Sequence, residues 1–144
     1  QNVSFVGSEA LAQELGIDGD GVVVTEVVPP AYEKNLLVGV NEYTDLLKKY
    51  FPEAEPTFGG LEGFANARIL AEALKRSGEN LDRGKFISAM ESIRDFDLGL
   101  ASPVSFSGTE HQGMQRVYTT YIKAGKFVLF SDWQEIKPFI SSEN

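Results

Sequence analysis

The N-terminal part of the chain alternates between a strand-like and a helix-like pattern of apolar residues. Residues 2–6 are typical of the end of a β-strand, and apolar positions at helical spacing follow from Ser8, a good N-cap, to Gly16, a natural helix stop. The run VVVTEVVPP, residues 22–30, is β-branched and almost continuously apolar, which predicts an interior strand ended by two prolines. Because a first strand needs a neighbour, we expect the chain to begin inside a larger fold.

Three successive helices are predicted in the middle of the chain. Apolar residues recur at spacings of three and four over 35–50 and over 61–78, and residues 53–60 between these segments are typical of a loop. Gly78 is a natural C-cap for the second helix, and Asp82 is a natural N-cap for the third. The apolar face of the second helix is expected to hold Phe64, Ala67, Leu70, Ala71 and Leu74.

The C-terminal part returns to strand patterns. Residues 103–108 are a short strand candidate, and residues 116–133, rich in Val, Tyr, Thr, Phe and Ile, predict a β-hairpin that turns at Ala124 and Gly125. Strands at both ends and helices between them place the chain in the α/β class, although three helices in a row depart from a regular alternation of strand and helix.

Composition and charge narrow the function classes. The 144 residues carry a net charge of -8 without a cluster of Lys and Arg, which argues against a nucleic-acid-binding surface. The sequence contains no cysteine and a single histidine, His111, so thiolate nucleophiles, Cys-based zinc sites and two-histidine mechanisms are excluded. No cofactor or metal is expected.

Sequence motifs of catalysis are absent, and the chain is not expected to be an enzyme. Gly59, Gly60 and Gly63 lack the spacing of a phosphate-binding loop, and there is no G-x-S-x-G elbow. His111 lies in a polar segment where a histidine is usually a loop residue. Asp-Gly-Asp-Gly at 18–21 lacks the downstream glutamate of a calcium loop, so it is expected to form a plain turn.

The best candidate site joins Glu9, at a junction between strand and helix, to the aromatic residues around Gly59 and Gly60. In open α/β sheets ligands bind beyond the carboxyl ends of the strands, where a carboxylate can hold an ammonium group and rings such as Phe64 can cover an apolar side chain. In the alternative interpretation Glu9 only complements the helix dipole and Phe64 only fills the core. Residue types leave both interpretations open.

Several segments, taken in their order, resemble one known family. They are FVGSEALAQELG, GVVVTEVVPP, LEGFANARILAEALKRSG, FISAMESIRDFDLG, VSFSGTEHQGMQRVY and IKAGKFV. The order is similar to the C-terminal part of the branched-chain amino-acid (Leu/Ile/Val) type periplasmic substrate-binding proteins of ABC transporters, and the likeness covers nearly the whole chain. It implies part of a two-lobed type I periplasmic binding fold, with three αβα layers, a mostly parallel sheet and a C-terminal β-hairpin.

The resemblance also implies a division of the chain and a role for two residues. Residues 1–144 would be a C-terminal fragment, in which 1–29 and 117–135 belong to the C-terminal lobe and 30–116 pack on the N-terminal lobe. Glu9 matches the acidic position that holds the ligand's α-ammonium group, and Phe64 matches an aromatic position that lines the pocket from the other lobe. The residues that would hold the ligand's carboxylate precede this chain.

The implied function is that of an extracytoplasmic solute-binding component of an ABC importer, located in the periplasm or outside the cell. Its partners would be an amino acid or related small solute and a membrane permease, with no nucleic acid. A small-molecule sensor or receptor domain of the same fold is the alternative, because the fold does not fix the output, and an enzyme comes last. Since apolar helix faces would lose their partner strands, we expect the fragment to form a homodimer.

Overall fold

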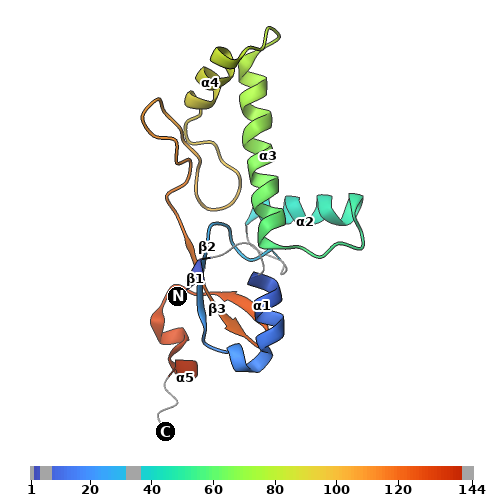
Figure 1. The fold of residues 1–144 in the computed structure, drawn as a ribbon, viewed down its shortest axis with the longest axis vertical. Helices are drawn as coiled ribbons and strands as arrows, with labels where there is room; N and C mark the ends of the chain where they lie inside the picture. The colour runs from blue at the N-terminus through green and yellow to red at the C-terminus, as the bar shows by residue number, and fades with distance from the viewer. Residues whose placement is uncertain (1, 4–7, 32–36, 141–144) are drawn as a thin grey trace.

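A computed structural model of the chain describes residues 2–3, 8–31 and 37–140. A small sheet with short helices lies at one end of the molecule, and the long helix α3 (Phe58–Ser77) rises from it toward α4 (Arg83–Glu91) at the opposite end (Figure 1). We call the sheet with its covering helices the sheet part, and residues 37–117, which hold α2 (Val38–Tyr50), α3 and α4, the helical part.

The sheet part is built on four strands in the order β1-β2-β3-β4. They are β1 (Asn2–Val3), β2 (Val23–Glu26), β3 (Tyr118–Lys123) and β4 (Lys126–Leu129). The predicted interior strand is confirmed, since β2 pairs with β1 on one side and β3 on the other. The hairpin is confirmed too, and its turn residues Ala124 and Gly125 have φ of 48° and 75°, which suits the tight turn of a two-residue hairpin.

The pairing directions differ from the expected mostly parallel sheet. Among the described strands only β1 and β2 pair in parallel, whereas β2–β3 and β3–β4 are antiparallel. The physical reason is local for β3 and β4, because a two-residue turn can only join antiparallel strands. For β2 and β3, the chain leaves the sheet for the helical part and re-enters it running in the opposite direction.

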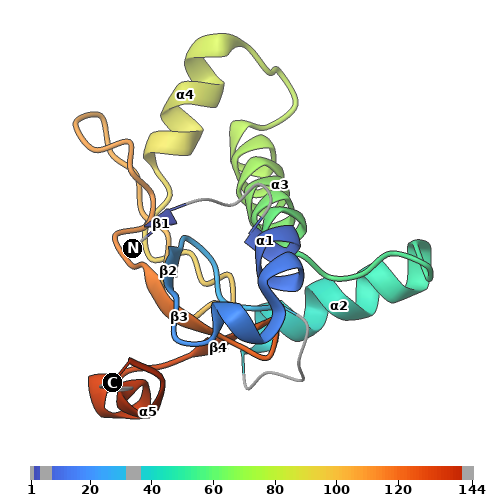
Figure 2. The same cartoon turned by 60° about the horizontal axis from the view of Figure 1, so that its bottom comes forward.

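Two faces of the sheet are covered by different helices, as the pleat requires. One face packs against α1 (Ser8–Leu15), and the other packs against the chain around the short helices η2 (Trp133–Glu135) and α5 (Lys137–Ile140), as Figure 2 shows. The strand residues in these two clusters are Val24, Ile122 and Phe127 on the α1 side and Val23, Tyr121 and Val128 on the other. The three-layer αβα arrangement is therefore present in the sheet part.

The segment between α1 and β2 has a structural role. It forms the short helix η1 (Gly16–Gly19) and a turn, and the Asp20 carboxylate accepts a hydrogen bond of 2.6 Å from the backbone N–H of Ala124. The Asp-Gly-Asp-Gly sequence thus forms a turn, and one of its carboxylates holds the hairpin in place.

Three helices follow one another in the helical part, as predicted. They are α2 (Val38–Tyr50), α3 (Phe58–Ser77) and α4 (Arg83–Glu91). Asp82 caps α4 by accepting from the N–H of Lys85 at 2.8 Å, and Gly78 ends α3 with a φ of 75°. The predicted loop 53–60 is wrong at its end, because Thr57 accepts from the N–H of Gly60 at 3.0 Å and starts α3 at Phe58.

The apolar face predicted for α3 is largely on the surface. Its exposed residues include Leu70 and Leu74, which are 48% and 42% exposed, while the buried positions of the helix are Phe58, Leu61, Ala65 and Ala73. A helix rich in Ala and Leu carries two apolar stripes, and the other described residues cover one of them. Spacing alone does not tell which stripe the neighbours cover.

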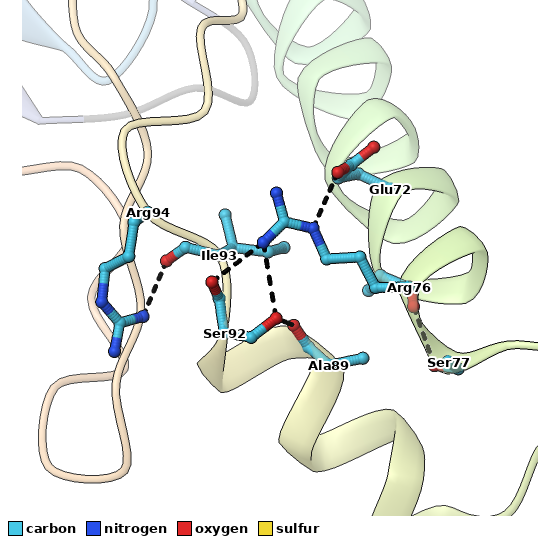
Figure 3. A network of polar contacts seen from close by, with 8 residues as sticks. Glu72, Arg76, Ser77, Ala89, Ser92, Ile93 and Arg94 are labelled. Atoms are coloured by element: carbon cyan, nitrogen blue, oxygen red, sulfur yellow. Dashed lines mark hydrogen bonds and ion pairs between the residues drawn. The ribbon is translucent and has the colours of Figure 1, made fainter.

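Arg76 ties the far end of α3 to Ser92, which directly follows α4 (Figure 3). Arg76 donates from Nε to Glu72 at 2.7 Å and from Nη1 to the carbonyl of Ser92 at 2.9 Å, and Arg94 donates to the carbonyl of Ile93 at 2.9 Å. The strand candidate 103–108 forms only a single bridge, Val104 to Phe96, because the next N–H groups bond within the loop.

The return of the chain from the helical part to the sheet part is fixed by close contacts. The N–H of Gly39 donates to the carbonyl of Gly99 at 3.0 Å, and the buried hydroxyl of Tyr118 donates to the carbonyl of Leu100. Arg116 donates to the carbonyl of Ala101 at 3.1 Å. The turn 98–101 is thereby held between α2 and the first residue of β3.

Candidate functional site

Glu9 lies where the sheet part meets the helical part. It stands in the first turn of α1, half-buried, and its Oε1 accepts a hydrogen bond of 2.5 Å from the backbone N–H of Phe58, the first residue of α3. The first N–H groups of a helix have no partner within it, and a negative charge there is favoured by the helix dipole. A single carboxylate thus serves the N-termini of two helices.

A hollow of about 320 Å³ opens beside this carboxylate, and we call it the Glu9 hollow. The sheet part contributes Glu9, Gln13, Gly125, Lys126 and Phe127 to its walls, and the helical part contributes Glu55, Pro56 and Thr57. Its volume is at the lower end of the range of small-molecule sites. The hollow therefore has walls from both parts of the chain and offers charged groups together with one apolar ring.

Phe64 lies elsewhere on α3. Its half-buried ring packs against Tyr43 with the ring centroids 5.8 Å apart, and the guanidinium of Arg68 lies 5.8 Å from its centroid. Phe64 is not among the residues that line the Glu9 hollow. Glu9 meets the start of α3, one and a half turns before Phe64.

Phe58, one of the aromatic residues that the sequence placed beside Gly59 and Gly60, meets Glu9 through its backbone. Its ring is fully buried and makes an edge contact with Phe127, with centroids 5.3 Å apart, while its backbone N–H faces Glu9. Thr57 was the signal in the sequence for the start of α3, because a threonine directly before an apolar residue is a common helix start. Recognising that cap would have placed the first N–H groups of α3 at residues 58–60.

A second hollow, of about 290 Å³, has the single histidine of the sequence in its wall. Glu62 and His111 both line it, between residues of α3, the segment after β2 and the loop 104–114. His111 is exposed, as expected of a loop residue, and its Nε2 lies 3.5 Å from a carboxylate oxygen of Glu91. The remaining walls are mainly apolar.

The described residues hold neither a grouped set of metal-ligand side chains nor a membrane-spanning helix. Within residues 2–3, 8–31 and 37–140, no three His, Asp or Glu side chains are grouped so that they could hold a metal ion. In the same part of the chain, no helix is both long and apolar enough to cross a membrane.

Comparison with known proteins identifies the family. A family described as "Periplasmic binding protein" matches residues 1–126, and the chain belongs to this family. A possible leucine/isoleucine/valine-binding protein from Rhodopirellula baltica has a solved structure that is 34% identical, with a TM-score of 0.83 over 93% of this chain. The resemblance found in the sequence is therefore confirmed.

More distant structures share the fold. A branched-chain amino-acid ABC transporter protein from Thermus thermophilus with bound valine is 20% identical, with a TM-score of 0.71 over 90% of this chain. A fatty acid ABC transporter substrate-binding protein from Thermomonospora curvata is also 20% identical, with a TM-score of 0.66 over 82% of this chain. The chain spans 36%, 37% and 31% of the three solved chains, in the order given. No curated protein matches it.

Proposed function

We propose that this chain is the C-terminal portion of an extracytoplasmic solute-binding component of an ABC importer. Membership of the periplasmic binding family and the length of the solved relatives support this proposal. Residues 1–29 and 117–135 would belong to the C-terminal lobe and 30–116 would pack on the N-terminal lobe. The observed separation into a sheet part and a helical part fits this division.

The solute is proposed to be an amino acid or a related small organic solute, with Glu9 holding its ammonium group. The supporting observation is that the Glu9 carboxylate lines a hollow walled by both parts of the chain. A carboxylate has about four acceptor sites, so the bond from the Phe58 N–H leaves capacity for an ammonium donor. For Phe64, the support for a place on the pocket wall is the sequence resemblance alone.

The charge of Glu9 separates two kinds of solute that the related structures name. One of those structures holds valine, which carries an ammonium group, and another is named for fatty acids, which carry only a carboxylate. A carboxylate in the wall attracts the first kind and repels the second at short range. We therefore favour a solute with an ammonium group, and binding without chemical conversion.

Isothermal titration calorimetry on the longer protein that carries this chain tests the proposal. Glu9→Gln is expected to weaken leucine or valine binding by about 1.5–3 kcal/mol, roughly tenfold to more than a hundredfold, because a charge-assisted hydrogen bond is lost. Glu14→Gln is the matched control, since Glu14 lies on the same helix, is exposed and does not line the hollow. Equal affinity of the Glu9→Gln protein and the wild type would refute the role of Glu9.

Two partners complete the proposal. The longer protein would deliver its solute to a membrane permease, as expected of an importer component. The 144-residue chain on its own would form a homodimer, because the stripe of α3 that contains Leu70 and Leu74 is apolar and exposed.

A further inference from the structure

We propose that the second hollow, which has Glu62 in its wall, binds a small aliphatic ammonium compound at the Glu62 carboxylate, and we call it the Glu62 hollow. Its walls come from α3, residues 27–28 and residues 98–114, and it shares no lining residue with the Glu9 hollow. The inference therefore concerns a second binding site and does not rest on the solute role of Glu9.

The first argument is the charge of Glu62. Its side chain is half-buried in the second turn of α3, and the part of the chain that the structure describes supplies no hydrogen bond or ion pair to it. Arg68 of the same helix pairs with Glu42 instead, and no lining residue of the hollow is a lysine or an arginine. The imidazole of His111, which is also in the wall, has its Nε2 3.5 Å from the carboxylate of Glu91. A partly buried carboxylate pays a cost of desolvation, and a cation that pairs with it offsets that cost.

The second argument is the apolar character of the other walls. Besides Glu62, the polar side chains of the wall are Asn66, one helical turn further along α3, and His111. A mainly apolar hollow with a few polar groups is typical of a small-molecule site, and about 290 Å³ is near the lower end of the size range of such sites. The larger apolar residues that line it are Val27, Val28, Ile69, Leu98, Val104, Phe106 and Met114. These walls favour a short aliphatic body, while the carboxylate selects an ammonium group.

The third argument is that the loop wall of the hollow is already formed. The N–H of Phe106 donates to the carbonyl of Ile93, and the N–H of Ser105 donates to the carbonyl of Gly113, both at 3.0 Å. A Cβ at Gly113 would lie 2.5 Å from Cζ of Phe106 and 3.0 Å from Cγ1 of Val104, so the Phe106 ring packs directly on the glycine. A wall that is held in place before binding lowers the entropic cost of binding.

The test follows the methionine methyl groups by carbon-13 NMR in the longer protein that carries this chain. Met114 lines the Glu62 hollow, whereas Met90 lines a different hollow beside α4 and serves as an internal control. The probe is isopentylamine, which is positively charged at neutral pH. Isopentanol and isovalerate have the same branched carbon chain, but the first is uncharged and the second is negative.

Isopentylamine is expected to shift the Met114 signal in a saturable manner and to leave the Met90 signal unchanged. Isopentanol and isovalerate should bind at least about tenfold more weakly, and Glu62→Gln should weaken isopentylamine binding by a similar factor, because a charge-assisted contact is lost. Glu79→Gln is the matched control, since Glu79 is exposed just beyond α3 and does not line the hollow. It should bind isopentylamine as the wild type does.

Glu9→Gln distinguishes the two sites, because an amine also matches the role proposed for Glu9. A Met114 response that survives Glu9→Gln and is weakened by Glu62→Gln supports the second site. A response that is lost in Glu9→Gln and kept in Glu62→Gln would overturn it, and so would equal binding of isopentylamine and isopentanol. A Met114 signal that isopentylamine does not shift would also overturn it, as expected if another part of the longer protein fills the hollow. Leucine binding is measured separately, so either proposal can fail while the other stands.

Discussion

Replacing Gly39 with alanine tests the closest backbone contact between α2 and the turn 98–101. An added Cβ at this position would lie 2.0 Å from the carbonyl oxygen of Leu98 and 3.1 Å from the carbonyl carbon of Gly99. Both are backbone atoms, so no side-chain rotation can relieve the contact. The turn is also held from the other side, because Tyr118 donates to the carbonyl of Leu100.

Opposing effects set the size of the change in the free energy of unfolding that Gly39→Ala causes. Alanine in place of glycine inside a helix is worth about 0.5–1 kcal/mol in favour of folding. Overpacking costs about 1–3 kcal/mol, and displacing the Gly39 N–H from the Gly99 carbonyl, 3.0 Å away, costs about 1 kcal/mol more. The net expectation is that Gly39→Ala lowers the free energy of unfolding by about 1–3 kcal/mol.

Gly63→Ala is the matched control, because Gly63 lies inside α3 and a Cβ there would meet nothing within 4 Å. It should raise the free energy of unfolding by about 0.5–1 kcal/mol through the helix preference alone. Urea titrations of both variants and the wild type measure the difference. If Gly39→Ala were as stable as Gly63→Ala, the close approach of α2 to the turn 98–101 would be refuted.

Tyr118 and the exposed stripe of α3 give two further predictions. Burial raises the pKa of Tyr118 above its ordinary 10.0, although the Arg116 guanidinium opposes the shift. The neutral phenol therefore contributes stability that is present below about pH 10 and is lost as the pH rises through the folded-state pKa. In urea titrations, Tyr118→Phe should be less stable than the wild type by about 1 kcal/mol near pH 8, and its free energy of unfolding should fall less between pH 8 and pH 11. Light scattering of the 144-residue chain at tens of micromolar should show a dimer, and the double variant Leu70→Glu with Leu74→Glu should disrupt it. A wild-type monomer would contradict the expectation that a second copy covers the exposed stripe of α3.

Elements whose signals are local were predicted well from the sequence. Gly16 ends α1, and Asp82 begins α4, because stops and caps depend on one or two residues. The hairpin turn at Ala124 and Gly125 was placed correctly for the same reason. The interior position of β2 followed from its apolar residues on both faces, which only a strand covered on both sides can bury.

Features that depend on partners distant in the sequence could not be predicted. Contacts with α2, α4 and the sheet decide which stripe of α3 is buried. In the sequence, the two apolar stripes of this helix look equivalent. Glu9 was correctly assigned to the first turn of α1, yet its bond to Phe58 joins residues from opposite parts of the fold. The prediction of a mostly parallel sheet failed for the same reason, because no local sequence pattern shows in which direction β3 re-enters the sheet.

The start of α3 shows why core packing and the candidate site cannot be separated in this fold. The Phe58 ring is buried against Phe127 while its N–H reaches Glu9, so the ring fixes where the first N–H groups of the helix point. Thr57, which begins the helix, also lines the Glu9 hollow, and Phe127 lines it from the hairpin. A change at Phe58 would therefore alter stability and site geometry together, whereas Glu9→Gln leaves the buried ring in place and keeps an acceptor oxygen for the Phe58 N–H. For this reason Glu9, rather than the aromatic residues around it, is the position at which binding can be examined with the least change to the core.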